Sequence, residues 1–124
     1  MPIALHTVAE TASFLRDAKN AGLSSTARDV VVMAVAADPG AGDEIVGSGG
    51  IRKVRVAGRG KGKSGGYRIM VFHAGPNAPA YILALLSKGD RETFSADEVK
   101  AMRSMTDAIR RHWKARPRRS VGPA

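Results

Sequence analysis

Residues 51–86 read IRKVRVAGRGKGKSGGYRIMVFHAGPNAPAYILALL, and this stretch determines the class of fold. Polar and apolar side chains alternate along 51–56, which is the pattern of a strand with one buried face. Residues 67–72 and 81–86 are further strand candidates, and 81–86 is apolar on both faces, as expected for a central strand. Short connections rich in glycine and proline separate the three segments. The stretch therefore predicts an antiparallel three-stranded meander.

Two short helices are expected before this sheet. Apolar residues recur at helical spacing within 11–22, and the glycine at its end is suited to stop a helix. A second helix is expected to begin at 24–26, where Thr26 and Asp29 fit a capping box, and an Asp-Pro-Gly sequence ends it. The β-branched run 30–32 leaves a strand as the alternative there. Two helices joined by about two residues would form an antiparallel hairpin.

A longer helix is expected after the sheet. Ser95 and Glu98 form a capping box, and apolar residues then recur at alternating spacings of three and four up to Trp113. The other face of this helix carries Lys100, Arg103, Arg110 and Arg111. Residues 115–124 contain two prolines and three arginines, so we expect a disordered basic tail there. One domain is therefore predicted over residues 1–114.

Charge is the most informative property of the composition. The 124 residues carry a formal net charge of +9, and residues 51–91 alone hold nine basic side chains against one acidic side chain. Such a concentration of one sign indicates a surface for a polyanion, most often nucleic acid, although a solvated basic face is the simpler alternative. The chain has no cysteine, no evident signal peptide and no apolar run long enough to span a membrane. We therefore expect a cytoplasmic protein with no membrane partner.

Familiar catalytic and nucleotide-binding motifs are missing from the sequence. Gly62-Lys63-Ser64 lacks the glycine five positions earlier that a P-loop needs, and a strand rather than a helix is expected to follow it. The histidines His6, His73 and His112 have no spacing typical of metal ligands. We therefore expect no metal site and no cofactor.

A set of cations remains as the candidate for chemistry. Strand alternation places Lys53 and Arg55 on one face, and pairing with the next strand would bring Arg68 beside them. Crowded cations lower the pKa of a lysine and stabilise a developing phosphorane, as cleavage of RNA by its own 2′-hydroxyl requires. The set comprises Arg52, Lys53, Arg55, Lys61, Lys63, Arg68 and Lys88.

Part of the sequence resembles a known family. The string P-x-x-G-D-x-I-x-G-x-G-G-x-R-K-x-R over 39–55, followed by G-K-G-K-S-G-G-Y-R over 60–68, closely resembles RelE/HigB-type toxins of bacterial toxin–antitoxin modules. The likeness covers roughly residues 8–113. It implies an α+β fold in which an N-terminal helical hairpin packs on a twisted antiparallel β-sheet, with a C-terminal helix. It also implies ribosome-dependent cleavage of mRNA in the A site, a 2′,3′-cyclic phosphate product and neutralisation by a cognate antitoxin, expected to be a small helix-turn-helix protein.

The resemblance also assigns roles to individual residues. It implies that Arg68 stabilises the phosphate and protonates the leaving group, while Lys61 or Lys63 holds or deprotonates the 2′-hydroxyl. Tyr67 is a candidate for stacking on a base, although packing in the sheet is an equal alternative. The basic positions that match the RNA cleft of the family are Arg55, Lys61, Lys63, Arg68 and Lys88. Arg52, Lys53 and Arg59 are further candidates for RNA binding.

Two other functions remain open from the sequence. A non-catalytic RNA- or ribosome-binding protein would use the same cations, since binding and cleavage both require them. A gyrase-directed toxin of the ParE type would share the fold but lack the basic set that cleaves RNA.

Overall fold

The computed structural model describes residues 5–56, 66–86 and 93–115, and its centre is the predicted meander. Strands β3 (Arg52–Val56), β4 (Tyr67–His73) and β5 (Ala80–Leu86) pair antiparallel in chain order. Residues on both faces of β5 are buried, which confirms the prediction that this segment is an internal strand.

Two short strands extend the meander at its edges. Strand β1 (Val8–Glu10) pairs parallel with β5, and β2 (Asp43–Glu44) pairs antiparallel with β3. The strand order is β1-β5-β4-β3-β2, so the sheet is mixed and only its four strands from β5 to β2 are antiparallel. Neither edge strand is predicted from the sequence, because segments of three and two residues are too short to show an alternating pattern.

Helix α1 (Ala12–Asn20) is hydrogen-bonded to the sheet at its start and through Asp17 in its second half. The Oγ1 atom of Thr11 accepts a hydrogen bond from the backbone N–H of Phe14, which caps the helix, and donates to the carbonyl of Ile82 in β5. Further along, the carboxylate of Asp17 accepts a hydrogen bond from the backbone N–H of Leu85, at 3.1 Å. The helix predicted over residues 11–22 is thus confirmed.

Helix α2 (Ser25–Ala37) begins earlier than its predicted cap. The N-cap is Ser24, whose Oγ accepts from the backbone N–H of Ala27 at 3.1 Å, so the assignment of the cap to Thr26 is wrong. The tight turn after α1, in which Gly22 adopts a φ of 77°, brings the chain back into helical geometry within two residues. Residues 30–32 are helical, and the alternative of a strand there is also wrong.

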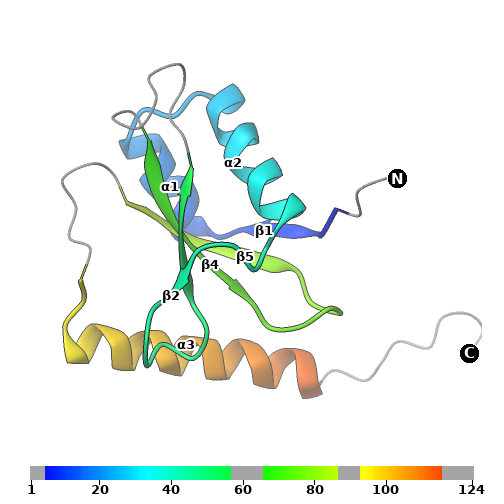
Figure 1. Cartoon of the computed structure of the whole chain (residues 1–124), viewed down its shortest axis with the longest axis vertical. Helices are drawn as coiled ribbons and strands as arrows, with labels where there is room; N and C mark the ends of the chain where they lie inside the picture. The colour runs from blue at the N-terminus through cyan, green and yellow to red at the C-terminus, as the bar shows by residue number, and fades with distance from the viewer. Residues whose placement is uncertain (1–4, 57–65, 87–92, 116–124) are drawn as a thin grey trace, which may run out of the picture.

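Helices cover both faces of the sheet. The core cluster on one face combines Phe14, Val31 and Val35 of α1 and α2 with Val71 and Ile82 of the sheet. On the opposite face, Met102 of α3 (Ala96–Ala115), together with the half-buried Val99 and Ile109, packs on Ile51, Met70, Phe72 and Leu83. Figure 1 shows α3 on one side of the sheet and α1 and α2 on the other. Ser95 and Glu98 form the predicted capping box at the start of α3.

A β-bulge in β5 changes which side chains face α3. Met70 of β4 pairs with Ala84 and Val71 pairs with Ile82, which leaves Leu83 without a partner residue. Leu83 and Ala84 consequently contribute to the same core cluster on the α3 side. After this bulge the alternation is shifted by one, so Leu86 also joins that side.

Helix α3 packs against the glycine-rich stretch 42–50. Gly49 has a φ of 86°, and a side chain at this position would collide with Thr106 of α3. Thr106 is fully buried, and its Oγ1 donates to the carbonyl of Ser48 at 2.8 Å. The Ser48 hydroxyl in turn donates to the carbonyl of Ile45 and accepts from the N–H of Ile51. Backbone geometry and close packing therefore explain the glycines in the string that resembles the toxin family.

Candidate nucleic-acid interface

The centre of the candidate site is a pair of arginines on adjacent strands. Arg55 of β3 lies directly opposite Arg68 of β4 in the antiparallel register. The Cβ atoms of residues in this relation lie about 4.5–5.5 Å apart on the same face of a sheet. Both side chains project from the face that α3 covers elsewhere, because Val54 and Ile69, their neighbours along the strands, belong to the core on the opposite face. The predicted approach of Arg68 to Arg55 is confirmed.

Lys53 extends the pair along β3. It precedes Arg55 by two residues and lies opposite Met70, so it shares the α3 face of the sheet. Arg55 is exposed, whereas Lys53 and Arg68 are half-buried. Lys53 and Arg68 both have further interactions, so they are held in place rather than free in solvent. We call Lys53, Arg55 and Arg68 the basic cluster.

An apolar side chain borders this cluster on the third strand. Leu86, the last residue of β5, lies opposite Arg68 and packs in the core cluster beneath α3. Its position depends on the bulge at Leu83, because strict alternation from the start of β5 would turn Leu86 to the other face. The sequence pattern therefore misses this neighbour, and no residue type in β5 signals the bulge.

Several predicted site residues lie outside the described residues. They are Arg59, Lys61, Lys63 and Lys88. The segments that carry them are joined to the described strands at one end of the meander. Val56, at the end of β3, is paired with Tyr67, and Arg68 is paired with Leu86, at the end of β5. The chain thus enters segment 57–65 and segment 87–92 beside the basic cluster.

Two other candidates for RNA binding lie away from the cluster. Arg52 faces the side opposite Lys53, and its guanidinium donates to the carbonyls of Ala41 (3.2 Å) and Gly42 (2.5 Å), where it fastens the chain that leads into β2. Tyr67 packs against the core beneath α1 and α2, on the face opposite Arg68. Its position therefore supports the alternative of packing rather than stacking on a base at the cluster.

The histidines have structural surroundings. His73 Nε2 lies 3.1 Å from the carbonyl oxygen of Ala78 in the turn after β4, and its ring contacts His6 edge-on. His112 contacts the ring of Trp113 in the same way. Among the residues that the structure describes, no three His, Asp or Glu side chains come together as ligands for a metal ion. Within the same residues, no helix is both long and apolar enough to cross a membrane.

The arrangement of the cluster suits the binding of a phosphate. Guanidinium groups donate several hydrogen bonds in a planar fork that matches phosphate oxygens, and they remain protonated at any physiological pH. Two arginines and a lysine on one sheet face can therefore hold a phosphodiester and stabilise additional negative charge on it.

Comparison with family models identifies a match over most of this chain. Residues 6–116 match the model described as the RelE toxin of the RelE / RelB toxin-antitoxin system. The matched range contains every helix and strand described above, and thus the whole basic cluster.

Proposed function

Because the chain belongs to the RelE toxin family of toxin–antitoxin systems, we propose that it is an endoribonuclease that cleaves mRNA in the ribosomal A site without a metal ion. The observation that carries this proposal is the direct cross-strand opposition of Arg55 and Arg68. Like charges placed opposite each other destabilise a sheet, so their presence is best explained by a polyanionic ligand. Membership of the family also implies an antitoxin partner; we propose a small helix-turn-helix protein for it and the cytoplasm as the place of action.

The proposed reaction is an internal transfer of the phosphoryl group. The 2′-hydroxyl of one nucleotide loses its proton and its oxygen attacks the adjacent phosphorus. The bond from phosphorus to the 5′-oxygen of the next nucleotide breaks, and that oxygen takes up a proton from the lysine that received the first one or from water. The products are a 2′,3′-cyclic phosphate and a free 5′-hydroxyl, and the phosphorane between them carries additional negative charge.

Each member of the cluster has a role that fits its chemistry. Arg55 and Arg68 donate hydrogen bonds to the phosphorane oxygens, since a guanidinium keeps its proton and acts through charge and hydrogen bonding. Lys53 contacts a neighbouring phosphate. Lys61 or Lys63 supplies the base, because an amine can lose its proton. Lys88 adds a further cation to the cleft.

The decisive experiment compares variants of single arginines on programmed ribosomes. A short mRNA is bound with its codon in the A site, and the products and their end groups are followed over time. Arg68→Gln should lower the cleavage rate by about 10²–10³, as expected when one donor to a developing oxyanion is removed. Arg16→Gln is the matched control, because it removes the same charge from the exposed surface of α1.

The end groups separate the proposal from its alternative. A 2′,3′-cyclic phosphate from the parent protein and the Arg16 variant, with loss in the folded Arg68 variant, supports the nuclease. Intact message with ribosome binding preserved would show a non-catalytic RNA-binding protein. Equal cleavage by a folded Arg68→Gln protein would remove this residue from the mechanism.

A further inference from the structure

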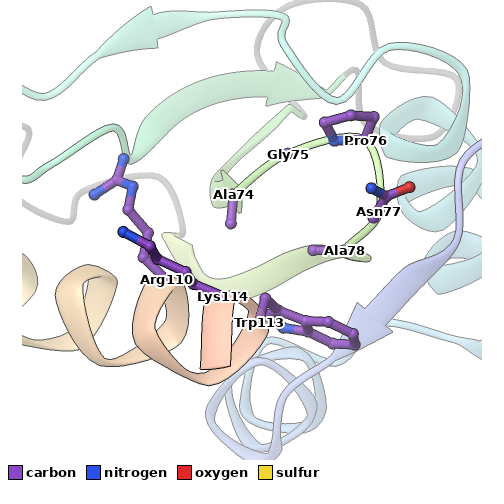
Figure 2. A pocket seen from close by; sticks show the side chains of 8 residues that line it. All are labelled: Ala74, Gly75, Pro76, Asn77, Ala78, Arg110, Trp113 and Lys114. Atoms are coloured by element: carbon purple, nitrogen blue, oxygen red, sulfur yellow. The ribbon is translucent and has the colours of Figure 1, made fainter. Parts of the chain in front are cut away.

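A depression lies at the opposite end of β4 from the basic cluster. It has a volume of about 300 Å³, and its walls come from the turn after β4 and from the last two turns of α3. Figure 2 shows Arg110 and Lys114 on one side of it, and the turn on the other. The lining residues are Ala74, Gly75, Pro76, Asn77, Ala78, Arg110, Trp113 and Lys114. Ala74 follows Arg68 by six positions, so the depression lies about 20 Å along the strand from the cluster.

The indole of Trp113 is a fixed wall of this depression. Its Nε1 donates a hydrogen bond of 2.7 Å to the hydroxyl of Tyr81 in β5, which holds one edge of the ring against the sheet. The remainder of the ring borders this depression and also a second one, of about 450 Å³, on the side of residues 5–7. The ring thus offers an immobilised aromatic surface at the protein exterior.

The side of the depression formed by α3 is positively charged. The guanidinium of Arg110 lies 4.9 Å from the ring centre of Phe72 and donates to the carbonyl of Gly49, yet 45% of its side chain remains exposed. Lys114 is exposed one helical turn further on. Residues 108–114 contain three Lys and Arg side chains and no Asp or Glu. Arg110 also lies 4.0 Å from the carboxylate of Asp107, one turn earlier in α3, so Arg111 and Lys114 are the basic side chains of this end without an acidic neighbour in 108–114.

We propose that this depression, the Trp113 pocket, binds one unpaired nucleotide of an RNA strand. The base lies against Trp113, and its phosphate contacts Arg110 and Lys114. Single-stranded RNA is recognised by the stacking of bases on aromatic rings and by cations beside the backbone, and the pocket provides both. The side-chain amide of Asn77 can donate to or accept from the edge of the base. The choice of RNA as ligand rests on the proposed function.

The pocket would give the protein a second RNA-binding site, separate from the site of cleavage. A contact about 20 Å from the scissile phosphate cannot take part in the reaction, but it can fix the orientation of the protein on its substrate. Aromatic stacking adds this hold without a requirement for one sequence, since every base presents a flat face.

The test uses the fact that Trp113 is the only tryptophan in the chain. Its intrinsic fluorescence therefore reports the pocket alone in the unlabelled full-length protein. The probe is the penta-adenylate r(A)5, and the expected result is saturable quenching as a base stacks on the indole. Trp113→Ala should weaken binding of a 5′-labelled r(A)5, measured by anisotropy, by about 5- to 150-fold.

A second variant guards against loss of folding in the Trp113 variant, because that substitution also removes the bond to Tyr81. Lys114→Gln should weaken r(A)5 binding by about two- to fivefold, the effect of one exposed charge pair. Lys100→Gln is the matched control: it removes the same charge from the same helix, about 21 Å away, and should change binding less.

The outcomes separate this inference from the proposed function. Arg16→Gln should leave the quenching intact, because Arg16 lies on the exposed surface of α1 and lines neither the pocket nor the basic cluster. Cleavage of mRNA without quenching would refute the proposal that the pocket binds RNA, while the proposed nuclease activity would stand. Quenching without cleavage would refute the nuclease activity, while RNA binding by the pocket would stand. Equal losses of r(A)5 affinity in the Lys100 and Lys114 variants would show that binding depends only on the overall positive charge, and would refute the inference. Equal quenching by a poly-glutamate peptide would also overturn it and indicate a protein ligand.

Discussion

The opposition of Arg55 and Arg68 predicts a substitution that raises stability and lowers activity together. Arg55→Gln removes one of two like charges that face each other across adjacent strands. Side-chain pairs that lie directly opposite each other change the free energy of unfolding by on the order of 0.2–1 kcal/mol, and a pair of like charges lowers it. Arg55 is exposed, so solvent screens the repulsion and the gain should fall in the lower half of that range. For a chain of this length, we expect the Tm to rise by about 1–3 °C.

Thermal unfolding followed by circular dichroism at low and high salt measures this gain. In 1 M NaCl the screening length falls to about 3 Å, so the difference from the parent protein should disappear. Cleavage on programmed ribosomes should fall by about 10²–10³ in the same variant. Arg16→Gln, on the other side of the sheet, should change neither quantity appreciably. A lower Tm for Arg55→Gln, or a gain that persists in 1 M salt, would refute the argument that the site stores unfavourable charge repulsion.

Three further predictions concern α3 and the end of the chain. Gly49→Ala should lower the free energy of unfolding, measured in urea, by more than about 1 kcal/mol, because Gly49 has a positive φ and lies against α3. Gly75→Ala is the control and should have a smaller effect, because a side chain at Gly75 meets open space. Equal effects of the two substitutions would contradict the close packing of Gly49 against α3. Thr106→Val should lower the free energy of unfolding by about 1–3 kcal/mol, because the buried carbonyl of Ser48 loses the hydroxyl that donates to it. The control Thr26→Val, at an exposed position, should lower it by less than about 0.5 kcal/mol. Truncation after Ala115 should leave the free energy of unfolding unchanged. It should weaken ribosome binding and reduce the dependence of that binding on salt, because it removes three arginines. Identical salt titrations of ribosome binding for the two proteins would exclude a role for these residues in binding RNA.

The sequence predicts the basic cluster well because two simple regularities determine it. Alternation in 51–56 assigns Lys53 and Arg55 to one face, and a short antiparallel connection brings Arg68 beside them. The long helix from Ala96 is equally predictable, since its capping box and apolar spacing agree.

Other features depend on tertiary contacts that leave no local pattern. Strand β1 exists because β5 offers it a partner, and its three residues would not be a strand elsewhere. The bulge at Leu83 shifts the alternation in the middle of an entirely apolar segment, where either register looks the same in the sequence. Ser24 and Thr26 are both good capping residues, and only the turn after Gly22 decides between them.

The hydrogen bond from the Leu85 N–H to Asp17 has a consequence for self-association. Strand β1 covers β5 only from Ala80 to Ile82, so the rest of β5 is an edge that another chain could extend by pairing. The Asp17 carboxylate occupies a backbone donor on that edge and places a negative charge beside it. An inward-facing charge of this kind opposes the addition of a foreign strand, which protects the most apolar strand of the sheet from aggregation. The Asp17 side chain thus gives a backbone donor near the end of β5 a partner within the same chain.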